Sequence, residues 1–311
     1  MMHQSSSSKS EILLNRSTMI FDLKRIAGFI HSHPIGSLTR GRAWWRVVSW
    51  QLGSRLLPFP VELPWIAGSC LVTERGMTGA TGNWYCGLHE FWDMGLLLHY
   101  FGDEAGREDG FLDVGANAGS YTVLASAVCG RRTIAFEALP ATFARLERNV
   151  RANEIESLVD ARCSAVGAAN GTILFTADRN SMNQVAEDGY RGPTKEVPVV
   201  PLDEVFPVGT DLPSFWKIDV EGFEREVLAG ALRCLADPRV KVVLLEGDDP
   251  EISSTMKDCG FVRVAYDPFK RSVSPSSDGS HGDNHVWMRE PKLVEDRCQA
   301  SRPIEVMELS I

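Results

Sequence analysis

The sequence of 311 residues lacks any apolar run of the ~18 residues needed to cross a bilayer. It also lacks a signal-peptide type of apolar segment, because Ser5–Ser8 lead into a polar stretch. Its seven cysteines include no C-x-x-C pair, which argues against a zinc finger and a disulfide framework. We therefore expect a soluble, cytoplasmic protein whose cysteines stay reduced.

The chain has no overall basic excess, since its net charge is −9. A general nucleic-acid binder needs a basic footprint, so we expect no nucleic-acid partner. The charge is uneven, however: residues 1–60 carry +6 and the remainder carries −15. Such an arm is either a solvated helical extension or a peripheral membrane contact.

Proline and helical periodicity divide the chain into four segments. We expect an N-terminal tail and helical extension (1–64), a pre-core or lid segment (65–108), a core domain (109–290) and a C-terminal tail (291–311). Short strands with glycine turns are expected over 65–86, and a helix over Leu88–Tyr100. Two apolar stripes in the extension should pack against the core or a second subunit, which makes a homodimer plausible: Ile20, Phe21, Leu23, Ile26, Ala27 and Ile30; and Trp44, Trp45, Val47, Val48 and Leu52.

From Asp109 onward, short apolar strands alternate with helices. This pattern predicts an α/β, Rossmann-like fold with a mostly parallel seven-stranded sheet and helices on both faces. The expected core strands are 110–114, 133–136, 158–163, 215–220, 240–245, 261–266 and 285–289. An inserted strand pair is expected at 172–176 and 196–200, before the fourth core strand.

A glycine-containing loop follows the first core strand, in the segment Asp113-Val114-Gly115-Ala116-Asn117-Ala118-Gly119-Ser120-Tyr121. Its G-x-x-x-G spacing differs from the G-x-G-x-x-G of dinucleotide sites. The Asp113 carboxylate would repel a pyrophosphate but suits the ammonium and sulfonium of S-adenosyl-L-methionine. Glu137 ends the next strand, 22 residues past Gly115, where a carboxylate can accept both hydroxyls of a ribose. The expected cofactor is therefore S-adenosyl-L-methionine.

Two rival functions remain open on these residues. One is an NAD-type Rossmann oxidoreductase, which the missing glycine and Asp113 disfavour. The other is a non-catalytic, membrane-associated adaptor that uses the basic residues 1–60 and their tryptophans.

Two blocks of sequence resemble the FkbM-type methyltransferases. The first is Asp113–Thr122 with Ala135-Phe136-Glu137-Ala138 and Leu146 through Asn149 and Asn153, and the second is Trp216–Glu224 (WKIDVEGFE) with Val227–Gly230. The resemblance covers about residues 80–290, and Ala138 departs from the family's usual proline. It implies a class I methyltransferase fold and, usually, O-methylation of a hydroxyl on a sugar, glycolipid or natural product. N- or C-methylation stays open.

The site predicted from these blocks has three groups of residues. Asp219 is the leading candidate for a general base; Glu221, a first-turn acid, and His89, in a lid segment, are the alternatives. Glu246 and Asn183 are candidates for contacting a small-molecule or glycan acceptor. His281 and His285 could complete a metal site with carboxylates, but we expect no metal. The expected cofactor contacts are Asp113, Gly115, Ala116, Asn117, Gly119, Tyr121, Glu137, Ala138, Ala165 and Glu90.

Overall fold

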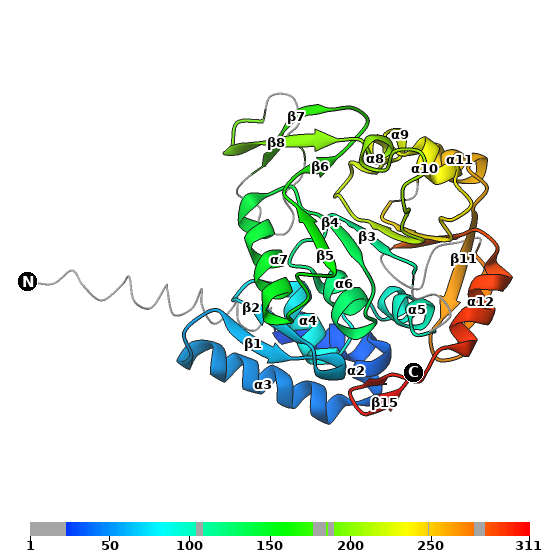
Figure 1. Ribbon diagram of the computed structural model, residues 1–311. Coiled ribbons are helices and arrows are strands. Elements are labelled where there is room, and N and C mark those ends of the chain that lie inside the picture. The colour runs from blue at the N-terminus through cyan, green and yellow to red at the C-terminus, as the bar shows by residue number, and fades with distance from the viewer. Residues whose placement is uncertain (1–22, 104–107, 177–184, 186–189, 248, 277–283) are drawn as a thin grey trace, which may run out of the picture.

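The computed structural model describes residues 23–103, 108–176, 185, 190–247, 249–276 and 284–311. At its centre lies an eight-stranded sheet in the order β12-β11-β13-β10-β9-β3-β4-β5 (Figure 1). The strands are β3 (Phe111–Val114), β4 (Thr133–Phe136), β5 (Val159–Arg162), β9 (Phe215–Ile218), β10 (Val242–Leu245), β11 (Val262–Asp267), β12 (Ser272–Pro275) and β13 (His285–Met288).

The strand directions confirm the predicted Rossmann-like fold. Strands β5, β4, β3, β9 and β10 are parallel, and β13 runs antiparallel between β10 and β11. The sheet has eight strands rather than the expected seven, because the chain turns back after β11 and adds β12. The Asp267 side chain accepts hydrogen bonds from the amides of Phe269 and Lys270, which forms a turn that the apolar pattern did not reveal.

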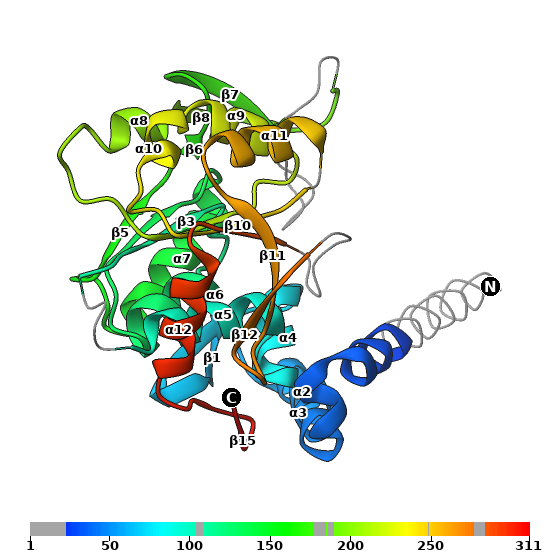
Figure 2. The ribbon, with the colours of Figure 1, turned by 90° about the vertical axis from the view of Figure 1, so that its right-hand side faces the viewer.

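Helices cover both faces of the sheet (Figures 1 and 2). One face holds α8 (Leu202–Val205), α9 (Glu224–Ala229), α10 (Leu232–Ala236) and α11 (Pro250–Asp258), and the other holds α5 (Phe91–Phe101), α6 (Ser120–Val123), a π-helical turn (Leu124–Val128) and α7 (Pro140–Ala152). Side chains alternate between the two cores: Val242 and Leu244 enter one, and Val243 and Leu245 the other. Burial on both faces explains why these strands read as continuous apolar runs.

The inserted strand pair is confirmed as part of a small separate sheet. Strand β7 (Gly171–Thr176) pairs antiparallel with β8 (Thr194–Val200), and β6 (Ala165–Val166) adds a parallel strand to β8. This sheet lies beyond the carboxyl end of β5 in the chain and next to α8 and α9 (Figure 1).

The N-terminal extension is helical over residues 23–32, α2 (Pro34–Leu38) and α3 (Arg40–Leu56). It is followed by the hairpin β1 (Val61–Pro64) and β2 (Cys70–Thr73), and by α4 (Thr78–Cys86), where strands were expected. Of the stripe expected at Trp44, Trp45, Val47, Val48 and Leu52, Val47 is buried in the core. Helix α3 also buries Ala43, Trp50 and Ser54, and it turns Trp45 and Leu52 outward.

Residues 291–311, expected as a tail, form helix α12 (Pro291–Ala300) and the hairpin of β14 (Glu305–Val306) and β15 (Leu309–Ser310). Helix α12 packs on α5. Val306 and Ile311 are buried in the same core as Ile30 and Val47. The two ends of the described chain therefore share one core.

Asn149 and Asn153, two asparagines of the first resembling block, join the pre-core segment to the core domain. The side chain of Asn149 accepts the amide of Val72 at 2.7 Å and donates to the Ala118 carbonyl at 2.8 Å. Asn153 makes the equivalent pair of bonds with the backbone of Cys70. Helix α7 thus holds strand β2 and the loop after β3 in a fixed relation.

We expect Asn149→Ala to lower the free energy of unfolding by about 2–3 kcal/mol, because it leaves a buried amide and a buried carbonyl without partners. Urea denaturation would measure the change. Asn170→Ala is the control, since its one side-chain bond, to Glu204, is exposed and should contribute little. An unchanged urea midpoint for Asn149→Ala would contradict this account of the junction.

Candidate active site

The site lies at the carboxyl ends of β3 and β9, where the strand order reverses direction. This is the position at which doubly wound sheets bind their ligands. The amide of Asp219 donates to the Val114 carbonyl at 2.9 Å, so the two loops touch. Gly115 has φ +82°, and a Cβ there would lie 1.8 Å from the Asp219 carbonyl oxygen. Only glycine fits this approach.

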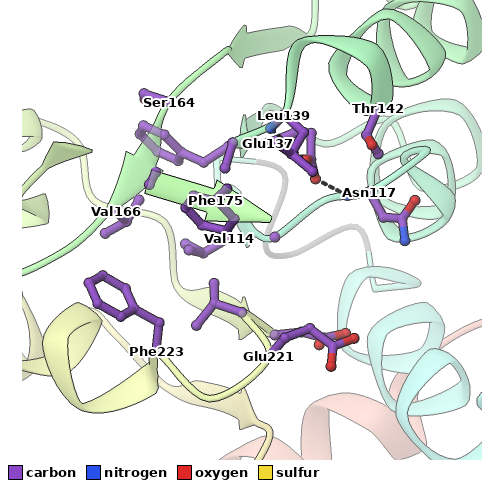
Figure 3. A pocket seen from close by; sticks show the side chains of 16 residues that line it. Val114, Asn117, Glu137, Leu139, Thr142, Ser164, Val166, Phe175, Glu221 and Phe223 are labelled. Atoms are coloured by element: carbon purple, nitrogen blue, oxygen red, sulfur yellow. Dashed lines mark hydrogen bonds between the residues drawn. The ribbon is translucent and has the colours of Figure 1, made fainter. Parts of the chain in front are cut away.

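A first pocket opens beside Glu137 (Figure 3). The Glu137 carboxylate accepts the Asn117 amide at 3.0 Å and the Leu139 amide at 2.9 Å, one on each oxygen. Each carboxylate oxygen has a further lone pair for a ligand. Burial raises the pKa of Glu137 to about 7, although the two amides oppose the shift. The carboxylate is therefore fixed in place and titrates near neutral pH.

The rest of the first pocket is mainly apolar. Phe175 from the inserted sheet packs in one cluster with Leu139, and Phe223 before α9 lies across the pocket from Glu137 and Asn117 (Figure 3). Predicted residues Ala138, Ala165 and Glu221 also line this pocket. Such a slot, with a carboxylate and aromatic rings in its walls, suits a nucleoside.

A second pocket adjoins the first, because Gly115, Asn117 and Asp219 line both. Its other lining residues include the predicted His89, Glu90, Asp113, Ala116 and Tyr121. Glu90 accepts a hydrogen bond from the Tyr121 hydroxyl, which links the pre-core segment to the loop helix α6. The two pockets together form one elongated site across the loop after β3.

The inner end of the second pocket carries more negative than positive charge. The buried Lys217 ammonium pairs with Asp219, and its pKa is raised because the charges of Asp219, Glu90 and Asp113 outweigh the opposing effect of burial. Burial raises the pKa of Asp113 to about 6, with Lys217 and Thr122 opposing it, so Asp113 remains ionised at neutral pH. Three carboxylates therefore face one ammonium, an arrangement that favours a cationic ligand.

Asp219 is held as an anion from two sides. Burial alone would raise its pKa, but the charge of Lys217 and hydrogen bonds from Lys217 and Glu246 lower it. Burial and the Asp219 charge raise the pKa of Glu246 to about 8, so this carboxyl group keeps its proton more readily than an exposed one. An anion stabilised in this way is a weak proton acceptor, which disfavours the predicted role of Asp219 as general base.

His89 lies in the wall of the second pocket and also lines a side hollow formed by α3, α4 and residues 25–29. The Asn83 side chain, itself fully buried, accepts the His89 amide at 2.7 Å. The imidazole packs on Phe29, with ring centroids 5.1 Å apart. Its Nδ1 atom is buried against Gly82, where a Cβ would come within 2.0 Å, and has no hydrogen-bond partner among the described residues.

The remaining predicted residues lie elsewhere. Gly119 lines neither pocket; it precedes α6 with φ +88° and packs against Leu146 of α7. Glu246 lines neither pocket and acts on Asp219 instead. Asn183 and His281 lie outside the described residues, and His285 contacts Arg263. Within the described ranges, no group of three or more His, Cys, Asp or Glu side chains could hold a metal ion.

Sequence reasoning did not give Lys217 and Asn83 roles of their own. Lys217 could have been found as the one charged residue in the apolar strand Phe215–Ile218, since a buried lysine needs carboxylate partners. Asn83 left no such signal, because its burial depends on contacts with His89 and Ser120 that form only in the folded chain.

A family comparison matches residues 113–263 to the methyltransferase FkbM domain. The match spans just under half of the chain, and over it the sequence is similar to an FkbM methyltransferase domain. The matched segment contains the loop after β3, Glu137 and the Lys217–Asp219 pair. His89 and Glu90 lie outside it, so the pre-core segment supplies one wall of the second pocket.

One curated protein has a similar sequence. The "Hexuronic acid methyltransferase AglP" of Haloferax volcanii is 29% identical over 154 residues, which are 48% of this chain and 61% of that protein. The chain thus spans about three fifths of the relative's length.

Two solved structures are remotely similar. They are the N-terminal domain of human METTL16 (12% identity, TM-score 0.36, 62% of this chain and 64% of that chain) and precorrin-6y C5,15-methyltransferase from Geobacter metallireducens (13%, 0.35, 63% and 86%). The fold assignment rests on the strand order of the central sheet.

No helix in the described parts of the chain combines the length and apolarity that crossing a membrane requires.

Proposed function

We propose that this protein transfers a methyl group from S-adenosyl-L-methionine to a hydroxyl group of a sugar-containing acceptor. One observation carries the proposal: two pockets meet at Gly115, Asn117 and Asp219, with the Glu137 carboxylate in one and three carboxylates around Lys217 at the inner end of the other. The match of residues 113–263 to the FkbM domain supports the same reaction class.

The donor set fits the proposed cofactor part by part. In the first pocket, the unshared lone pairs of Glu137 suit a ribose diol, and the slot between Phe175 and Phe223 suits an adenine. At the inner end of the second pocket Asp113, Glu90 and Asp219 outnumber Lys217, which suits an ammonium and a sulfonium there, whereas Arg75 and Arg145 line the same pocket elsewhere. A pyrophosphate would meet these carboxylates with like charge, so a dinucleotide fits poorly.

When bound, S-adenosyl-L-methionine supplies an electrophilic methyl group. The protein's own task is to hold the acceptor oxygen in line with that group and to take up its proton. We assign the proton to the His89 imidazole, because His89 lines the second pocket; its Nδ1 is buried against Gly82, so Nε2 is the nitrogen that would take up the proton. Asp219 keeps its negative charge throughout and helps to hold the cation.

The acceptor is proposed to enter from the second pocket. Arg75 and Arg145 line that pocket, so a carboxylate on the acceptor could pair with a guanidinium group there. The printed name of the Haloferax relative, a hexuronic acid methyltransferase, supports a sugar acid as the acceptor.

A radiolabelled methyl donor offered with a panel of uronic acids, neutral sugars and their conjugates tests this function. We expect label in a sugar acid and none in a matched sugar that lacks a free hydroxyl. Calorimetry should show binding of S-adenosylhomocysteine and none of NAD. Binding of NAD alone would instead support the oxidoreductase.

The affinity for S-adenosylhomocysteine should depend on pH through Glu137. Because burial raises the Glu137 pKa to about 7 and the ribose hydroxyls need the ionised form, affinity should be maximal above pH 7. Below pH 7 it should fall about tenfold per pH unit, as expected when a ligand binds one protonation state. Calorimetry from pH 6 to 8 measures this slope. Glu137→Gln should bind weakly and without the slope, whereas a flat wild-type profile would exclude this role.

A further inference from the structure

Helix α3 presents an apolar stripe to solvent. Trp45, Val48, Leu52 and Leu56 are spaced by three or four residues and so lie on one helix face. Their exposed fractions are 69%, 45%, 59% and 82%. The opposite face, with Ala43, Val47 and Trp50, is the one buried in the core. We call these four exposed residues the outer stripe. Soluble proteins seldom expose a continuous apolar patch of this kind unless a partner covers it.

Basic residues border the outer stripe, and acidic residues are absent from the helix. At 100° per residue, Arg42 lies on one flank of the stripe and Arg55 on the other. Arg42 pairs with Glu308, and Arg55 bonds Gln51 in the preceding turn; both side chains stay exposed. The 17 residues of α3 contain no Asp or Glu, although the whole chain has a net charge of −9.

Two partners could cover an apolar stripe with basic flanks. In a symmetric dimer through α3, each copy would bring its arginines to a helix that has no carboxylate to receive them, so the contact would be repulsive. An anionic lipid surface can bind both the apolar outer stripe and its basic flanks. Phosphate headgroups pair with arginine, tryptophan sits at the headgroup level, and leucine enters the acyl boundary. The charge pattern therefore favours lipid over a second copy.

We propose that α3 docks the protein on an anionic lipid membrane, with the helix lying in the plane of the surface and its outer stripe inserted. The docking itself does not depend on the proposed function.

The same helix borders the candidate active site. Trp50 and Gln51 line the side hollow, which adjoins the second pocket through Gly76, Thr78 and His89. A docked α3 thus separates this hollow from the headgroups by one helix diameter, roughly 10 Å. Together with the proposed function, this favours an acceptor sugar that carries a lipid anchor.

Vesicle co-sedimentation of the full chain tests the docking. We expect binding to phosphatidylcholine vesicles that contain phosphatidylglycerol, and much weaker binding to phosphatidylcholine alone. The readout needs neither cofactor nor acceptor, so it can fail while methyl transfer succeeds, and the reverse. Absence of binding to the anionic vesicles would overturn the proposal.

Variants separate the apolar and the basic contributions. Trp45→Ser with Leu52→Ser should lower the partition coefficient by more than about tenfold. Arg55→Gln should lower it about fivefold, and only on anionic vesicles. Val208→Ser and Lys257→Gln change exposed residues outside α3, and should bind like the wild type. If the double variant unfolds in a circular dichroism melt, Leu56→Ser, at the most exposed position, replaces it.

Wild-type binding by both Trp45→Ser/Leu52→Ser and Arg55→Gln would reject α3 as the docking element. Light scattering gives the other decisive outcome. A wild-type dimer that becomes monomeric in the double variant would show that a second copy, rather than lipid, covers the outer stripe.

Discussion

Replacing Lys217 with methionine should lower the free energy of unfolding by about 3–5 kcal/mol, the usual cost of removing one partner from a buried ion pair. Methionine has a similar length but leaves Asp219, Asp113 and Glu90 without the ammonium that now compensates their charge. The carboxyl groups would then take up protons at higher pH. We therefore expect the loss of stability to grow from acidic pH toward neutral pH.

Chemical denaturation of the variant at pH 5 and pH 7.5 measures both effects. Lys241→Met is the matched control, because Lys241 pairs with the half-exposed Glu290 at the surface, and such pairs contribute about 1 kcal/mol or less. If Lys217→Met were as stable as Lys241→Met, the charges of the three carboxylates would not need compensation by the Lys217 ammonium. The proposed preference of the second pocket for a cation would then lose its basis.

His89→Gln should reduce the turnover number for methyl transfer by about 10²–10⁴-fold, the usual contribution of a positioned general base. Glutamine retains much of the size and polarity of histidine but cannot take up a proton at neutral pH. The affinity for S-adenosylhomocysteine should stay unchanged, because Glu137 and Asp113 are untouched. Radiolabel transfer to the acceptor found in the sugar panel, with calorimetry alongside, separates the two quantities.

Two further variants sharpen the assignment of the base. Gly82→Ala should also reduce turnover, since its methyl group would displace the imidazole from its present position. Asp219→Asn should weaken cofactor binding if Asp219 holds the cation. The opposite pattern would assign the base to Asp219 instead. In that pattern His89→Gln has normal turnover, and Asp219→Asn binds the cofactor normally but loses turnover. His31→Gln, at an exposed histidine, is the control.

The core fold was predictable because its signals are local. Strands β3, β9 and β10 are short, mostly apolar and buried on both faces, and each is followed by a glycine or an acidic residue. Glu137 could be placed from its spacing to Gly115 alone. Strand β12 was not predictable in this way, because it depends on a turn made by one side chain, Asp267, and has little apolar character.

The second pocket was less predictable, since it joins segments distant in sequence. His89 reaches the site because Asn83 holds its amide and Gly82 leaves space for its ring, and neither residue differs in type from many others in polar loops. Helix α3 shows a related limit. Its sequence is apolar around much of its circumference, so periodicity could not decide that Val47 faces inward and Val48 outward. Tertiary packing chose the face.

The core shared by the two ends of the chain has a consequence for biosynthesis. Ile30, Ala43 and Val47 share one core with Val306 and Ile311, so the core around the first helices is completed only by residues made 259 to 281 positions later (306 − 47 and 311 − 30). A nascent chain on the ribosome would therefore expose both faces of α3 until translation has nearly finished. In that interval the newly made protein would expose the most apolar surface of α3. A binding partner or chaperone that recognises α3 could therefore bind it before translation is complete.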